Sequence, residues 1–98
     1  MIKILVTGSN GQVGSEIKKI AKKRSEVKWL FTDRNSLDLS KIDLTVRFLD
    51  SAKPSIIINC AAYTNVDKAE SESRLANLIN VKAVDSLSKW SSLNNVKL

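Results

Sequence analysis

The chain has no histidine, one cysteine, one proline and only three glycines among its 98 residues. Without histidine it has no imidazole base and lacks the usual zinc ligands. The single cysteine, Cys60, cannot form an internal disulfide and lies in the apolar run SIIINC. We interpret it as a buried small residue of a protein from a reducing compartment, the cytoplasm, with a reactive thiol as the alternative.

Long apolar runs are also absent, since no stretch approaches the roughly 20 residues that a membrane span requires. We therefore expect no membrane partner. The net charge of +6 raises nucleic acid as a partner. The densest basic cluster, however, falls on the outer face and last turn of an expected helix, and consists of Lys18, Lys19, Lys22, Lys23 and Arg24. Aromatic residues are few and scattered, whereas single-strand binding needs them among the cations. We interpret the cluster as a solvated helix face and expect no nucleic-acid partner.

All three glycines lie in the stretch VTGSNGQVG, residues 6–14. A β-branched apolar run precedes them, and apolar residues at helical spacing follow, which predicts a strand, a glycine turn and an amphipathic helix. In dinucleotide-binding folds the first glycine of such a turn makes the bend, the second admits the diphosphate, and the third packs helix against strand. These would be Gly8, Gly11 and Gly14. A glycine-rich turn without a ligand is the alternative interpretation.

A second strand is expected in VKWLFTD, residues 27–33, and it ends at an acidic residue. Asp33 lies nineteen positions after Gly14, close to where dinucleotide folds place a carboxylate that binds the adenosine ribose. Arg34 follows directly, and a guanidinium at this place would bind a 2′-phosphate instead. The residues therefore leave both NADH and NADPH open.

The remaining pattern predicts one further strand and two helices. A helix is expected after Ser40, which forms a capping box with Asp43, and Lys53-Pro54 ends it. SIIINC at residues 55–60 is typical of a strand covered on both faces. The last helix is expected over residues 72–92, with its apolar stripe formed by Leu75, Ile79, Ala83, Leu87 and Trp90. NNVKL then indicates the opening of a fourth strand.

This order, β-α-β-α-β-α, predicts an α/β fold of the Rossmann type with three layers. We expect half of a doubly wound parallel sheet, with its strands in the spatial order 3-2-1. The first strand would then lie at an open edge. An open edge predicts either association through it, as in a homodimer, or marginal stability.

Three stretches resemble one protein family. VTGSNGQVGSEI, DLS and, with the greatest specificity, INCAAYTNVDKAESE are similar to the N-terminal half of the dTDP-4-dehydrorhamnose reductases. These enzymes belong to the extended short-chain dehydrogenase/reductase superfamily. The likeness covers residues 1–98, and it implies that they form an NAD(P)-binding Rossmann domain, the N-terminal part of a longer reductase.

The resemblance also implies roles for particular residues. The glycine loop would hold the diphosphate by its backbone amides, and the residues concerned are Asn10, Gly11, Gln12 and Val13. The adenosine half would lie against the end of the second strand and the residues after it, namely Asp33 or Arg34 at the ribose and Asp38 and Leu39 at the adenine. The loop after the third strand would line the nicotinamide riboside with Ala61, Ala62, Tyr63 and Thr64, and Val66 would lie near the sugar nucleotide.

The implied reaction is hydride transfer from NADPH or NADH to the C4 carbonyl of dTDP-4-dehydro-6-deoxy-L-mannose, giving dTDP-L-rhamnose. Members of the superfamily use a tyrosine with a lysine four positions later. The only tyrosine here is Tyr63, and Asp67 stands in the place of the lysine. We therefore expect no catalytic residue and no metal site in this chain, which would bind part of the cofactor but need the rest of a reductase to act on the dTDP-sugar.

Two alternatives remain open at this point. One is a non-catalytic relative that keeps the fold and binds a partner enzyme, as the regulatory subunit of methionine adenosyltransferase does. The other is a different extended reductase or epimerase that acts on a nucleotide sugar.

Overall fold

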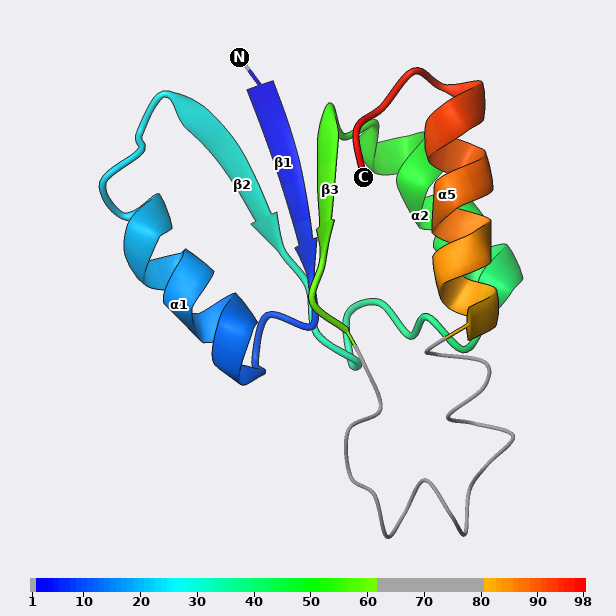
Figure 1. The fold of residues 1–98 in the computed structure, drawn as a ribbon, viewed down its shortest axis with the longest axis horizontal. Coiled ribbons are helices and arrows are strands. Elements are labelled where there is room, and N and C mark those ends of the chain that lie inside the picture. The colour runs from blue at the N-terminus through cyan, green and yellow to red at the C-terminus, as the bar shows by residue number, and fades with distance from the viewer. Residues whose placement is uncertain (1, 62–80) are drawn as a thin grey trace, which may run out of the picture.

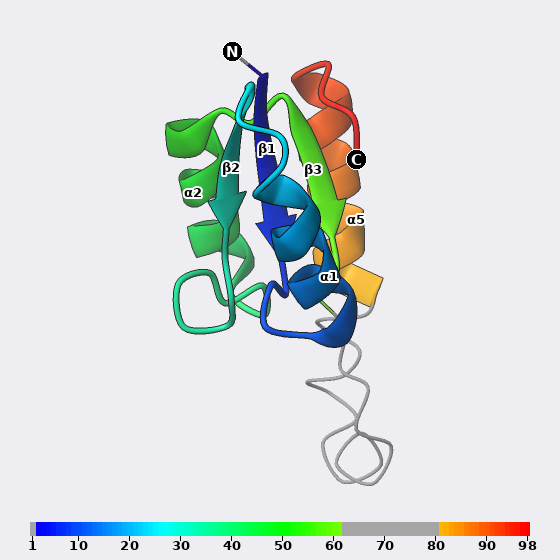
Figure 2. The same ribbon diagram turned by 90° about the vertical axis from the view of Figure 1, so that its left-hand side faces the viewer.

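The computed structural model of the chain describes residues 2–61 and 81–98. Strands and helices alternate along it: β1 (Ile2–Thr7), α1 (Gln12–Ala21), β2 (Val27–Phe31), α2 (Ile42–Ala52), β3 (Ile56–Asn59) and α5 (Ala83–Leu93). Figures 1 and 2 show three layers, with α1 on one face of the sheet and α2 and α5 on the other. The predicted α/β class and the doubly wound parallel arrangement are confirmed.

The central strand of the sheet is β1, with β2 on one side of it and β3 on the other. Both pairings are parallel, and Leu5 lies opposite Leu30 of β2 and Ile57 of β3. The predicted order 3-2-1 is therefore wrong, and the observed order is 2-1-3. The predicted open edge of β1 is wrong for the same reason, which removes the basis for expecting a homodimer through that edge.

The different order arises in residues 34–40, which contain turns at 34–36 and 39–40 and no strand, where the classical order has its third strand. The backbone N–H of Leu37 donates to the Asp33 carbonyl at 2.8 Å, and that of Lys41 donates to the Asp38 carbonyl at 3.0 Å. These local bonds use backbone N–H and C=O groups that a sheet ladder would need. The next strand along the chain is therefore β3. It takes the place beside β1 that the fourth strand has in the classical order.

Successive strands are added first on one side of β1, as β2, and then on its other side, as β3. The strand order therefore reverses between β1 and β3. In open α/β sheets ligands bind outside the carboxyl ends of the strands at such a switch point. Gly8 follows β1 and Cys60 follows β3, so the glycine loop and the end of the last sheet strand meet at this point. At the outer side of β3, the Ile57 N–H donates to the Lys97 carbonyl at 2.8 Å. Lys97 forms a parallel bridge with Ile56, as expected for the opening of a fourth strand.

The apolar core lies between the sheet and the helices α2 and α5. Its buried members are Leu5, Leu37, Leu39, Leu49, Ile57, Ala83, Leu87 and Trp90. The three members from α5 belong to the predicted stripe of that helix, while Leu75, Ile79 and the predicted start at residue 72 lie outside the described residues. Leu37 and Leu39 enter the core from the turn segment, which fixes that segment against the sheet.

Helix α1 is packed differently from its predicted amphipathic pattern. Val13 and Ile20 are 63% and 56% exposed, and Gly14 is the one residue of α1 that is buried. The helix is therefore anchored by its first turn, next to the glycine loop, and by the aromatic residues of β2. Lys18 lies over the Phe31 ring, which stacks on Trp29 at 5.8 Å between ring centroids.

Trp90→Phe is expected to lower the free energy of unfolding by about 1.5–3 kcal/mol, since hydrogen bonds to charged groups contribute this much. Trp90 is 7% exposed, and its Nε1 donates to Asp50 Oδ1 at 2.8 Å, which joins α5 to α2. Trp29→Phe is the matched control, because the Trp29 indole donates to a more exposed backbone carbonyl, that of Arg24, at 3.2 Å. Urea denaturation followed by circular dichroism measures both. Equal losses for the two variants would contradict this role of Trp90.

Candidate functional site

Two glycines of the loop are required by the fold itself. Gly8 has a φ of +62°, and a Cβ at this position would lie 2.6 Å from the Ala61 nitrogen. A Cβ on Gly14 would lie 2.6 Å from both the Gly8 carbonyl oxygen and Ser9 Cα. Real Cβ atoms do not come this close to backbone, so Gly8 brings the loop against the end of β3 and Gly14 brings α1 against the loop.

The middle glycine has no such explanation within the described residues. Gly11 has an extended backbone, with φ −78° and ψ 177°, which any residue can adopt. A Cβ there would meet only the Gly8 carbonyl oxygen, at 3.3 Å. Helix α1 begins at the next residue, with no acidic side chain in its first turn and no side-chain cap from the residues described. The amides and the positive dipole end of α1 are therefore open to an anion beside Gly11.

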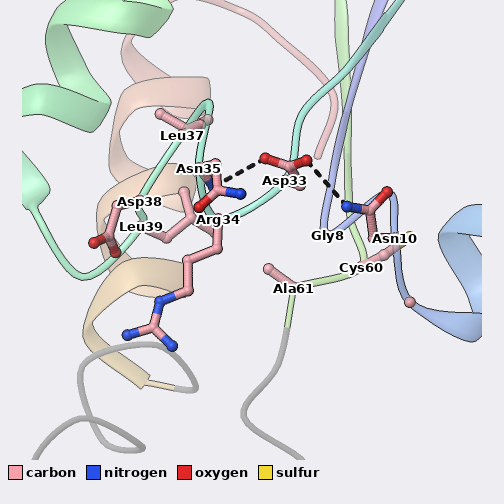
Figure 3. A pocket seen from close by; sticks show the side chains of 11 residues that line it. Gly8, Asn10, Asp33, Arg34, Asn35, Leu37, Asp38, Leu39, Cys60 and Ala61 are labelled. Atoms are coloured by element: carbon pink, nitrogen blue, oxygen red, sulfur yellow. Dashed lines mark hydrogen bonds between the residues drawn. The ribbon is translucent and has the colours of Figure 1, made fainter.

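A cavity of about 310 Å³ opens beside this loop, and Figure 3 shows the side chains that line it. Three chain segments contribute, each at the carboxyl end of a strand. The lining residues are Gly8, Asn10, Gly11, Asp33, Arg34, Asn35, Leu37, Asp38, Leu39, Cys60 and Ala61. The switch point of the sheet is thus hollowed, as a ligand site of this fold class requires.

Eight of the predicted site residues meet in this cavity, and they are Gly8, Asn10, Gly11, Asp33, Arg34, Asp38, Leu39 and Ala61. The predicted residues Gln12, Val13 and Gly14 belong to the first turn of α1 and do not line it. Ala62, Tyr63, Thr64 and Val66 lie outside the described residues. Sequence reasoning missed Asn35, Leu37 and Cys60. The alternation of Leu37 and Leu39 in the sequence could have indicated an apolar wall. The position of Cys60 directly after its strand could have indicated that it lines the cavity.

The Asp33 carboxylate stabilises the turn after β2 through hydrogen bonds. Its Oδ1 accepts hydrogen bonds from the backbone N–H groups of Asn35, at 2.9 Å, and Ser36, at 3.0 Å. Its Oδ2 accepts one from the Asn10 amide nitrogen at 3.0 Å. These donors, the Ser36 backbone first, lower the pKa of Asp33 below its ordinary value. Asp33 is therefore an anion at neutral pH, and Asn10 ties it to the glycine loop.

The Asp38 carboxylate has a similar role one turn later. Ser40 donates to Asp38 Oδ1 from its hydroxyl, at 2.6 Å, and from its backbone N–H, at 3.0 Å. The hydroxyl bond is the main reason that the pKa of Asp38 is lowered, and the charge of Arg34 adds to it. The predicted N-cap role of Ser40 is wrong, because its hydroxyl donates a hydrogen bond to Asp38. Helix α2 begins at Ile42, and Lys41 is its N-cap residue.

Cys60 is half-buried on the cavity wall, so the predicted full burial is wrong in degree. It directly follows β3, where the chain passes from the core to the switch point. Burial raises the pKa of the Cys60 thiol, which is therefore protonated at neutral pH and a weak nucleophile.

Two general features of the described part bear on the class of site. Within residues 2–61 and 81–98, no three histidine, cysteine or acidic side chains gather as a metal site would require. None of the helices in this same part of the chain is long and apolar enough to cross a membrane.

Acidification below about pH 5 is expected to destabilise the chain progressively, because carboxylates with lowered folded-state pKa values stabilise only while ionised. Their contribution is full above the ordinary value of 3.8 and is lost as the pH falls through the folded-state pKa. Solvent screening limits the contribution of Asp38 to less than about 1 kcal/mol. Denaturant titrations at pH 6 and pH 3 measure the loss, which should be smaller in Asp38→Asn. An unchanged loss in that variant would contradict this account of Asp38.

The fold and the cavity together define one half of a doubly wound α/β protein of the Rossmann type, with a glycine-rich turn and a cavity at the switch point. Comparison of the sequence and structure with known proteins agrees with this fold class and identifies the protein family within it. The chain belongs to the family described as the RmlD substrate binding domain, whose model matches residues 2–98.

Individual relatives are dTDP-4-dehydrorhamnose reductases, which confirms the resemblance seen in the sequence. The enzyme of Aggregatibacter actinomycetemcomitans is 37% identical over 95 residues, which cover 97% of this chain and 32% of that protein. Among solved structures, the Bacillus anthracis reductase in complex with NADP is 34% identical with a TM-score of 0.88, and 35% of its chain is covered. The Clostridium acetobutylicum reductase is 38% identical with a TM-score of 0.89, with 34% covered. The chain thus spans about a third of the length of these relatives.

Proposed function

We propose that this chain is the cofactor-binding part of a dTDP-4-dehydrorhamnose reductase. With NADPH or NADH, such an enzyme reduces the 4-keto group of dTDP-4-dehydro-6-deoxy-L-mannose to give dTDP-L-rhamnose. The observation that supports the proposal most strongly is the presence of a glycine at position 11. Its extended backbone does not require a glycine, and an added Cβ would meet one described atom closely, the Gly8 carbonyl oxygen at 3.3 Å. Gly11 nevertheless lies on the cavity wall, at a helix N-terminus that has no side-chain cap from the described residues. Close approach of a diphosphate to the backbone explains the choice.

The residues present fit a dinucleotide. The diphosphate would lie on the backbone amides from Asn10 to Gly14, where the helix dipole favours negative charge without a basic side chain. The adenosine would lie between the glycine loop and the turn after β2, on the apolar wall that Leu37 and Leu39 form. Asp33 and Arg34 border the place of the ribose. The bound cofactor would supply the hydride.

The other half of the cofactor would extend from Ala61 toward residues outside the described part. We propose that Ala62, Tyr63 and Thr64 line the nicotinamide riboside there and that Val66 lies near the sugar nucleotide. No acid that could protonate the product is proposed in this chain, so its residues bind and orient the cofactor while the rest of a reductase completes the site. A cytoplasmic location is part of the proposal, in keeping with a single cysteine that cannot form an internal disulfide.

A chimera tests this proposal. Residues 1–98 would replace the matching N-terminal portion of the Bacillus anthracis reductase, to which the chain is similar over its whole length. NADPH oxidation should then depend on added dTDP-4-dehydro-6-deoxy-L-mannose, and a Gly11→Val version of the same chimera should be folded but inactive. A folded chimera that binds no dinucleotide would overturn the proposal and favour the non-catalytic relative. A chimera that oxidises NADPH only with another nucleotide sugar would favour a different reductase.

A further inference from the structure

A chain of hydrogen bonds crosses the glycine loop and joins three elements of the site. Lys18, in the last turn of α1, donates from Nζ to Asn10 Oδ1 at 3.3 Å. Asn10 donates from its amide nitrogen to Asp33 Oδ2 at 3.0 Å. The first bond orients the Asn10 amide, because an oxygen that accepts from Lys18 leaves the nitrogen to face Asp33. The second holds the carboxylate against the glycine loop.

The opposite face of that carboxylate is also engaged. Asp33 Oδ1 accepts from two backbone N–H groups and from the Ser36 hydroxyl, the last at 3.3 Å. Figure 3 shows the Asp33 carboxylate between Asn35 and Asn10, with the Arg34 side chain extending away from it along the cavity. Asn10 is the donor to Oδ2, so its amide holds that oxygen toward the glycine loop.

We propose that Asn10 is a positioning residue that makes the site select an adenosine carrying a 2′-phosphate over one with a free 2′-hydroxyl. The inference rests on the proposed function, since it concerns the ribose of the same cofactor. A carboxylate that faces the ribose repels a 2′-phosphate and accepts a 2′-hydroxyl. With Asp33 held by Asn10, both of its carboxylate oxygens accept hydrogen bonds from donors within the protein. Arg34 is then the charged group that meets the 2′ position, and a guanidinium binds phosphate in bidentate geometry.

Two half-cofactor probes test the selection at the described residues alone. Adenosine 2′,5′-bisphosphate and 5′-AMP share the adenine and the 5′-phosphate, so any change in the glycine loop affects both and cancels in the ratio of their dissociation constants. We expect the wild-type chain to bind the bisphosphate more tightly. Asn10→Ala should reduce this preference about three- to tenfold, which corresponds to the net contribution of one ordinary hydrogen bond at an exposed position. Isothermal titration calorimetry measures both constants, and circular dichroism checks the fold.

A double-mutant cycle separates positioning from direct contact. Asp33→Asn removes the charge that Asn10 is proposed to control, so Asn10→Ala should have little further effect on the ratio in that background. A second pair controls for net charge: Lys18→Met should weaken the preference in part, whereas Lys19→Met should leave it unchanged. Lys19 is exposed, carries the same charge and pairs with Glu16 at 3.1 Å.

The outcomes are distinct for the two proposals. If the folded wild-type chain binds neither probe, the proposed function fails and the selectivity fails with it. If it binds both probes equally, or if Asn10→Ala leaves the ratio unchanged, the dinucleotide site stands and the role of Asn10 is overturned. The same is true if Asn10→Ala changes the ratio equally in the Asp33→Asn background, because Asn10 would then act on the ligand and not through Asp33.

Discussion

Gly8→Ala is expected to lower the free energy of unfolding by about 2–5 kcal/mol, enough to unfold much of a domain of this size. The left-handed backbone at φ +62° contributes about 1–2 kcal/mol of this cost for an alanine. The rest comes from overpacking, because the added Cβ would lie 2.6–2.7 Å from backbone atoms of Cys60 and Ala61. Relief would require β1 and β3 to separate at their carboxyl ends. Urea denaturation followed by circular dichroism measures the change.

Gly11→Ala is the matched control for that prediction. It adds the same methyl group three residues along the same loop, but at an extended backbone and with its nearest described contact at 3.3 Å. Its expected cost is below about 1 kcal/mol. Similar losses of stability for the two variants would contradict the distinction between a glycine needed by the fold and one needed by the ligand.

Gly11→Val is expected to weaken NADPH binding by about a hundredfold or more while the chain stays folded. The two methyl groups would occupy the space through which a diphosphate reaches the amides of α1, and each charge-assisted hydrogen bond lost costs about 1.5–3 kcal/mol. Titration followed by Trp29 and Trp90 fluorescence measures the affinity. Ser51→Val places the same side chain on an exposed position of α2 and should bind as the wild type does. Unchanged binding by Gly11→Val would show that the diphosphate does not use this loop.

Local pattern in the sequence was enough to predict the first half of the site. The spacing of the three glycines between a β-branched run and a helical repeat predicted the strand, the turn and the helix, and the end of the second strand placed Asp33 beside them. These features depend on neighbours along the chain, so periodicity and turn chemistry carry the information. The same holds for the stripe of α5, where Ala83, Leu87 and Trp90 are buried as predicted.

The strand order could not be predicted in this way. Leu37 and Leu39 alternate as in a strand, and both side chains are buried, yet the backbone around them bonds to Asp33 and Asp38 in turns. Whether those residues form a strand decides which side of β1 the next strand takes. The choice depends on the competition between local side-chain bonds and a sheet ladder, which a hydrophobic pattern does not record.

Long-range contacts account for the other differences. Asn10 and Asp33 are 23 positions apart, and their hydrogen bond exists only because β1 and β2 are neighbours with the turn folded back. The apolar pattern of α1 indicates a helix but not what covers it, and Val13 and Ile20 are largely exposed. Cys60 lies in an apolar run but follows its strand onto the cavity wall, so the pattern of neighbouring residues overstated its burial.

The most direct test of the central claim is an NMR titration of the isotope-labelled chain with NADPH, following each backbone amide. A dinucleotide at the switch point should cause saturable shifts at residues 8–14 and 33–39, with the largest changes at the first amides of α1. Shifts confined to other residues, or no saturable shift in a chain that gives a folded spectrum, would contradict a dinucleotide site in this cavity.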